Sequence, residues 1–214
     1  MRRTLTTGLS ICAMVALSLS TPTHAAPAGA TAFVEAAMNG NRDAVRALLK
    51  DGADVNTTQA DGMTALHWAA QKGDVELAKV LLYASANLKA TTRIGGYTPL
   101  LIASKNGDAA MIETLTQAGA DANVATTNGT TPLMLAAAAG KPAAVTALLD
   151  HGADVNAKET VKGETALTFA AALGRADVIR VLAAKGADVK VTTKAVDLTD
   201  FAKEEQEREH GGTR

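Results

Sequence analysis

The chain contains very little cysteine, few aromatic residues and no excess of basic charge. Cys12 is its single cysteine, and only 3% of its 214 residues are aromatic. Its 21 lysines and arginines are balanced by 22 aspartates and glutamates, which gives a formal net charge of -1. A chain that binds a phosphate backbone carries a basic excess, so nucleic acid is not expected as a partner. The scarcity of aromatic rings favours a core of small, closely packed helices.

The first 25 residues have the pattern of an export signal. Arg2 and Arg3 are basic, residues 9–19 are mostly apolar, and Thr23 and Ala25 form a small-x-small pattern before a predicted cleavage after Ala25. A membrane-spanning helix is the alternative, but it needs roughly 20 apolar residues and this run is shorter. We therefore predict a signal peptide at 1–25, an exported protein that is periplasmic or secreted, and no stable membrane insertion after cleavage.

Cleavage after residue 25 leaves a chain without cysteine. The lost segment holds Cys12, Arg2 and Arg3 but no acid, so the remaining chain has a formal charge of -3. An exported chain without thiols has no disulfides, no cysteine nucleophile and no thiolate metal ligands. These absences exclude several kinds of site at once.

One block of sequence recurs five times with a spacing of 33 or 34 residues. Each copy begins with a glycine, has a threonine two residues later and ends in small residues; the glycines are Gly29, Gly62, Gly96, Gly129 and Gly163. A second block follows in every copy, with a leucine at the same offset: Leu48, Leu81, Leu115, Leu148 and Leu182. Five copies at one period indicate a repeat array in which each unit stacks on its neighbours.

Each unit predicts two short helices. A threonine stands at the expected N-cap of the first helix, at Thr31, Thr64, Thr98, Thr131 and Thr165. A glycine follows that helix, and Asn41, Asp74 and Asp108 supply caps for the second helix in three units. The second helix ends at a glycine in four units, whereas Ser85 replaces it in the other. If that position is left-handed, the serine costs about 1 kcal/mol.

These motifs resemble the ankyrin repeat family. Residues 62–70 are similar to the Gly-x-Thr-Pro-Leu-His-x-Ala-Ala opening of that family, with alanine in place of proline, and residues 52–56 and 152–156 read Gly-Ala-Asp-Val-Asn. The resemblance implies an all-α ankyrin-repeat solenoid of about five helix-turn-helix repeats with a C-terminal cap. The repeat domain is predicted at 26–190, with units at about 29–61, 62–95, 96–128, 129–162 and 163–190. Residues 191–214 are predicted as the cap and charged tail, and an acidic docking tail is the alternative.

No catalytic or cofactor motif accompanies the repeats. After the signal peptide the histidines are His67, His151 and His210, and their spacing matches neither a zinc site nor a Ser/His/Asp site. His67 fills the family's histidine position, where the resemblance implies a hydrogen bond to the backbone of a neighbouring turn. The sequence predicts a protein that is not an enzyme and has no metal or cofactor. The remote alternative is a hydrolase or metal site assembled across units, which would depend on His67.

The ankyrin resemblance implies that partners, usually proteins, bind the concave surface lined by the turns and first helices. Specificity is expected at positions that differ between units, with the strongest contacts at the centre of the array. The candidate partner-binding residues are Met38, Asn39, Asp61, Met63, Gln71, Lys72, Arg93, Ile94, Tyr97, Lys105, Asn106, Asn128, Thr130, Lys162, Glu164 and Leu173. We expect a monomeric scaffold or protector of an exported protein, and a secreted effector that binds a host protein is the alternative.

Overall fold

The computed structural model describes residues 28–191. The predicted signal peptide and, apart from Val191, the predicted C-terminal cap lie outside the described residues. Within them the chain forms ten helices and no strand, with one isolated bridge between Thr58 and Thr64. The helices are α1 (Ala28–Met38), α2 (Arg42–Lys50), α3 (Ala65–Lys72), α4 (Val75–Tyr83), α5 (Pro99–Asn106), α6 (Ala109–Gln117), α7 (Pro132–Ala139), α8 (Pro142–Asp150), α9 (Ala166–Ala172) and α10 (Ala176–Ala184). This confirms the all-α repeat solenoid.

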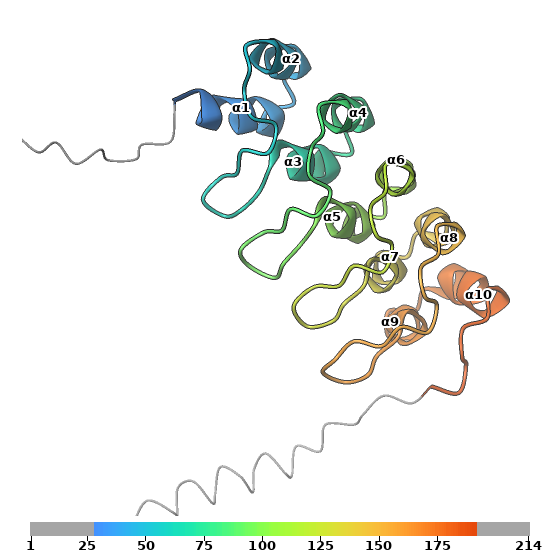
Figure 1. The fold of residues 1–214 in the computed structure, drawn as a ribbon. Coiled ribbons are helices and arrows are strands. Elements are labelled where there is room, and N and C mark those ends of the chain that lie inside the picture. Colours follow the sequence, from blue (N-terminus) through green and yellow to red (C-terminus); the bar gives the residue numbers. More distant parts are fainter. Residues whose placement is uncertain (1–27, 192–214) are drawn as a thin grey trace, which may run out of the picture.

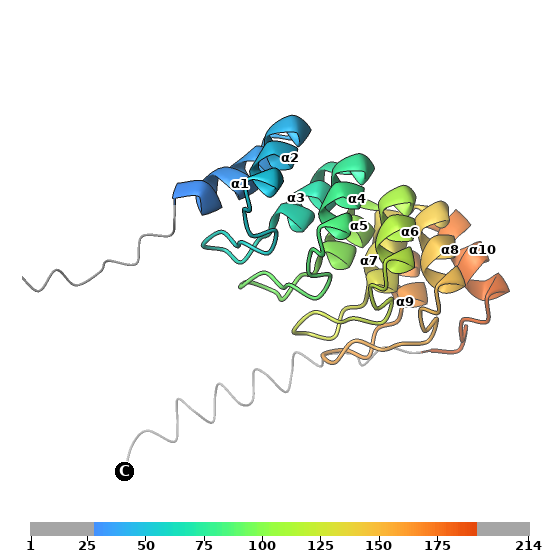
Figure 2. The same cartoon turned by 45° about the horizontal axis from the view of Figure 1, so that its top comes forward.

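The ten helices form two rows, and long turns project from one side of them. Helices α1, α3, α5, α7 and α9 make the inner row, while α2, α4, α6, α8 and α10 make the outer row (Figure 1). Figure 2 shows the turns extending from the starts of the inner helices, away from the outer row. We call the surface formed by these turns and the inner row the concave face. None of the described helices is long and apolar enough to cross a membrane.

Threonine caps start the inner helices of four units. The hydroxyls of Thr64, Thr98, Thr131 and Thr165 each accept a backbone N–H from the first turn of the helix that follows. The cap predicted at Thr31 is wrong, because α1 already begins at Ala28. In the four later units the residues before the threonine form a turn closed by a backbone hydrogen bond, namely Gln59 to Met63, Thr92 to Tyr97, Thr126 to Thr130 and Glu159 to Glu164, whereas no such turn precedes α1 among the described residues. The alanine-rich sequence of the first unit extends the helix instead.

The outer helices follow the capping pattern expected from their sequences. Asn41, Asp74 and Asp108 each accept a backbone N–H from their helix, whereas Lys141 and Arg175 make no side-chain cap bond. Ser85 ends unit 2 with a φ of +67°, and it is the one non-glycine residue with positive φ in 28–191. The predicted left-handed position is therefore present.

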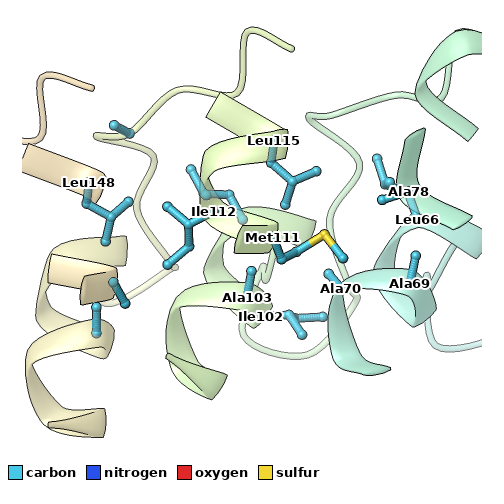
Figure 3. Packing of buried hydrophobic residues seen from close by; sticks show 14 of the residues in the cluster. Leu66, Ala69, Ala70, Ala78, Ile102, Ala103, Met111, Ile112, Leu115 and Leu148 are labelled. Carbon is cyan, nitrogen blue, oxygen red and sulfur yellow. The ribbon is translucent and has the colours of Figure 1, made fainter. Parts of the chain in front are cut away.

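Small and aliphatic side chains fill the space between the rows. Leu66 and Ala69 of α3 and Ile112 and Leu115 of α6 are fully or almost fully buried. Figure 3 shows that this aliphatic layer runs without interruption from Leu148 of α8 towards α3. The alanines let neighbouring helices approach closely. The core is therefore one continuous packed layer, which supports the turns rigidly.

Candidate partner-binding groove

A groove of about 270 Å³ lies on the concave face where units 2 and 3 meet. We call it the central groove. Its lining comes from two neighbouring turns and the helices that follow them. Asp61 and Met63 precede α3 and Gln71 lies in α3, while Thr92, Ile94 and Tyr97 precede α5 and Ile102 and Lys105 lie in α5. Six of the sixteen candidate residues therefore come together in one place, at the centre of the array. The part of the groove that is apolar consists of the side chains of Met63, Ile94, Tyr97 and Ile102.

The turn that precedes α5, residues 92–97, holds Tyr97 in place. The N–H of Thr92 donates to the carbonyl of Tyr97 at 3.0 Å, and the N–H of Tyr97 donates to the Thr92 hydroxyl, also at 3.0 Å. Gly95 has a φ of +80°, and a Cβ at this position would lie 2.7 Å from Cε2 of the Tyr97 ring. A glycine is needed here both for the backbone conformation and for the close approach of the ring.

His67 of α3 fixes the same turn through a hydrogen bond. Its imidazole is fully buried, with Nδ1 3.1 Å from the N–H of Thr64 and Nε2 3.0 Å from the carbonyl of Tyr97. Because the Thr64 N–H is a donor, Nδ1 accepts, and Nε2 carries the proton that it donates to Tyr97. Burial lowers the pKa of His67 more than its backbone hydrogen bonds raise it, so the ring is neutral at pH 7. The expected bond to a neighbouring turn is confirmed, and His67 is structural.

Lys105 provides a positive charge at the rim of the central groove. Its Nζ lies 5.7 Å from the centroid of the Tyr97 ring, within range of a cation–π interaction. In residues 28–191, neither Lys105 nor the neighbouring exposed Lys72 and Arg93 forms an ion pair with a carboxylate. By contrast, cations of the outer row do form ion pairs: Arg42 with Asp74, Arg46 with Asp43, Lys79 with Glu76, Arg180 with Asp177, and Lys185 with Asp150.

The remaining candidate residues lie outside the central groove. Lys72 and Arg93 are exposed and adjacent in sequence to residues that line it. Met38 and Asn39 lie at the end of α1, Lys162 and Glu164 lie in the turn before α9, and Leu173 follows α9. Asn128 is exposed, but its backbone carbonyl accepts hydrogen bonds from Thr160.

Two candidates have structural roles that argue against partner contact. Thr130 is only 8% exposed, and its hydroxyl bonds to the side chain of Asn128 within the turn. Asn106 donates from Nδ2 to the carbonyl of Gln71 at 3.1 Å and thereby joins the ends of two inner helices. Variation between units singled out both positions, but sequence variation does not distinguish a partner contact from a local hydrogen bond.

The groove also contains two residues that the sequence did not single out, Thr92 and Ile102. Ile102 stands at the same position of its unit as Trp68, and it is 7% exposed at the base of the groove. Trp68 itself is half-buried, with Nε1 donating to Oε1 of Gln59 at 3.1 Å. No sequence signal identifies Thr92, because its role is to form hydrogen bonds with Tyr97 in the folded turn.

The described residues do not gather metal-binding side chains in one place. Among residues 28–191, no group of three or more histidine, aspartate and glutamate side chains could hold a metal ion. His151 lies 3.3 Å from Glu113 of the preceding unit, as a pair between neighbouring outer helices. The geometry offers a rigid surface with an apolar groove, an aromatic ring and unpaired cations, and such a surface can recognise another molecule.

Comparison with known proteins agrees with this architecture. The family model described as ankyrin repeats (3 copies) matches residues 14–92 and 100–193, which is more than half of the chain. Human inversin is 46% identical over 59 residues, which cover 28% of this chain and 6% of inversin. Human protein phosphatase 1 regulatory subunit 27 is 37% identical over 65 residues, which cover 30% of this chain and 42% of that protein.

The chain thus spans less than half the length of these relatives. Mouse inversin is similar over a shorter stretch, with 56% identity over 45 residues that cover 21% of this chain and 4% of inversin. Ankyrin repeats are generic protein-interaction modules, and one of these relatives is named as a regulatory subunit of a protein phosphatase. With ten paired helices, capped turns and a matching family model, the chain belongs to the ankyrin repeat family.

Proposed function

We propose that this protein is an exported, non-enzymatic binding module that holds a partner protein on its concave face. The observation that carries the proposal is the central groove, which combines apolar side chains, a fixed tyrosine and a lysine with no ion-pair partner in 28–191. Tyrosine is enriched among binding hot spots, and burying aromatic and aliphatic side chains contributes much of the free energy of binding. The partner is an exported protein that the module scaffolds or protects.

The groove is built before any partner arrives. The Thr92–Tyr97 bonds and the His67 bond to the Tyr97 carbonyl fix the turn, while Gly95 leaves room for the ring. A preformed surface loses little conformational entropy on binding, which favours affinity. Ile94 is 88% exposed at this turn, so a partner that covers it gains apolar burial. The relative that is named as a phosphatase regulatory subunit supports a binding role for the repeats.

A capture experiment tests this proposal. The chain from residue 26 is tagged and used to capture proteins from the cell envelope, alongside the double variant Ile94→Ala with Lys105→Ala. Tyr83→Ala is the matched control, because Tyr83 is 95% exposed on the outer row and its side chain is as accessible to a partner as that of Ile94. We expect capture of a partner to fall roughly tenfold or more in the double variant and to be unchanged in the control.

The same experiment decides between the proposal and its alternatives. Equal capture by the double variant and wild type would show that the central groove is not the binding surface. Capture of a host protein instead of an envelope protein would support the secreted effector. An activity lost in His67→Gln at unchanged folding would support a site assembled across units, although both ring nitrogens of His67 are engaged in structural bonds.

A further inference from the structure

Asparagine side chains join neighbouring units on the side of the array where the outer helices end. Oδ1 of Asn123 accepts the N–H of Asp154 at 2.7 Å, and its Nδ2 donates to the carbonyl of Gly152 at 2.9 Å. We call this pair of bonds an asparagine clamp. Asn156 forms the same clamp with Asp188 at 2.8 Å and Gly186 at 3.3 Å. Units 3 and 4, and units 4 and 5, are joined in this way.

The first junction has half of this arrangement. Oδ1 of Asn56 accepts the N–H of Asn87 at 2.7 Å. Together the three asparagines show that a carboxamide fits between the loops that follow the outer helices of neighbouring units. It fits because a carboxamide accepts through its oxygen and donates through its nitrogen at the same time.

The junction between units 2 and 3 has no clamp, because Lys89 stands where units 1, 3 and 4 have asparagine. The equivalent backbone groups are the N–H of Asp121 and the carbonyl of Gly119. No hydrogen bond from the described residues reaches either of them. Lys89 cannot replace asparagine, since its ammonium group has no acceptor to offer to an N–H.

A cavity of about 280 Å³ opens at this junction. Leu88, Leu100, Ala120 and Val124 form its apolar wall, and Lys89 and Asp121 also line it. Its volume is close to the lower end of pockets that hold small ligands. We call the cavity and the two free backbone groups the junction notch. An apolar pocket beside an unmatched donor and acceptor has the composition of a small recognition site.

We propose that the junction notch binds the carboxamide side chain of an asparagine in a partner protein, with an adjacent aliphatic side chain in the cavity. The bound carboxamide accepts from the Asp121 N–H and donates to the Gly119 carbonyl, as Asn123 does one unit further along. The aliphatic side chain is buried against Leu88 and Val124. This site is separate from the central groove, so it does not depend on the function proposed for the concave face.

Nuclear magnetic resonance tests the proposal on the chain from residue 26. The probe is the dipeptide N-acetyl-leucyl-asparagine N-methylamide, in which the asparagine side chain is the only primary carboxamide, and the observed signal is the backbone amide of Asp121. We expect this signal to shift saturably, with half-saturation at roughly millimolar probe, since two hydrogen bonds and one side chain must offset the cost of association. N-acetyl-leucyl-aspartate N-methylamide, whose side chain accepts but cannot donate, should bind at least roughly tenfold more weakly.

Two variants at one position provide the control. Lys89→Asn supplies the clamp within the chain and should abolish the saturable shift. Lys89→Ala leaves the notch vacant and should keep it, and its spectrum reports whether substitution at this position disturbs the fold. A shift that does not saturate, that persists in Lys89→Asn, or that is equal for the aspartate probe would overturn the proposal.

Discussion

The missing clamp between units 2 and 3 predicts that Lys89→Asn stabilises the array. In the variant, Oδ1 can accept the Asp121 N–H and Nδ2 can donate to the Gly119 carbonyl, as at the junctions that follow. Each hydrogen bond contributes about 0.5–1.5 kcal/mol net, and exposed bonds lie at the low end of that range. Two of them should raise the free energy of unfolding by about 1 kcal/mol.

The effect should also alter how unfolding proceeds. The stability of a repeat array is the sum of the stabilities of its units and of the interfaces between neighbours, so the weakest interface limits cooperativity. The junction between units 2 and 3 lacks a clamp and contains a cavity, so we expect it to separate more readily than the two junctions that have full clamps. Strengthening it should make unfolding more cooperative and raise the melting temperature by about 2–4 °C.

Urea unfolding followed by circular dichroism measures this prediction. The matched control is Asn123→Lys, which copies the lysine of unit 2 into unit 3 and removes a clamp that the structure shows. It should lower the free energy of unfolding by about 1 kcal/mol. If Lys89→Asn leaves stability unchanged while Asn123→Lys lowers it, the junction does not accept a clamp and the reasoning fails. If neither variant changes stability, the clamps contribute nothing measurable.

Three further predictions concern single positions. Ser85→Gly should stabilise unit 2 by up to about 1 kcal/mol, because φ is +67°, whereas Ala84→Gly at a φ of -80° should not; equal melting temperatures would contradict this. The pKa of His67 is lowered by burial, so the unfolded chain binds a proton first and stability should fall as pH drops below about 6.5; His67→Gln should flatten urea midpoints measured from about pH 7.5 to 5.5, and parallel curves would refute it. Burial raises the pKa of Glu159, but backbone N–H groups of its turn lower it by more. The stabilisation by the Glu159 carboxylate is therefore present above about pH 4.5 and lost on acidification. In Glu159→Gln the loss of stability on acidification should be smaller, and an unchanged acid transition would exclude the effect.

Much of the fold could be predicted from the sequence because each element has a local signal. The threonine caps, the helix-ending glycines and the left-handed Ser85 follow from what those residue types do to the backbone next to them. Thr31 shows the limit of such local reasoning. It follows a glycine by two residues as the other cap threonines do, but among the described residues no hydrogen-bonded turn holds the entering chain outside the helix before it.

The candidate groove could be predicted only in part, since it depends on contacts between units. Differences between units identified Tyr97, Ile94 and Lys105, because these positions break the repeated pattern. They did not identify Ile102, which is buried although the equivalent residues Trp68 and Phe169 are half-buried. They also did not exclude Thr130, whose hydroxyl bonds within its own turn. The junction notch was missed as well, because its meaning depends on hydrogen bonds that cross from one unit to the next.

Site-specific photocrosslinking in the cell that produces the protein tests the central claim most directly. A photoreactive amino acid replaces Ile94 in the central groove, and in a second strain it replaces Tyr83, which is at least as exposed on the outer row. We predict a discrete crosslink to one exported protein from position 94 and none from position 83. A crosslink from position 83 with none from position 94 would contradict the claim that the concave face holds the partner.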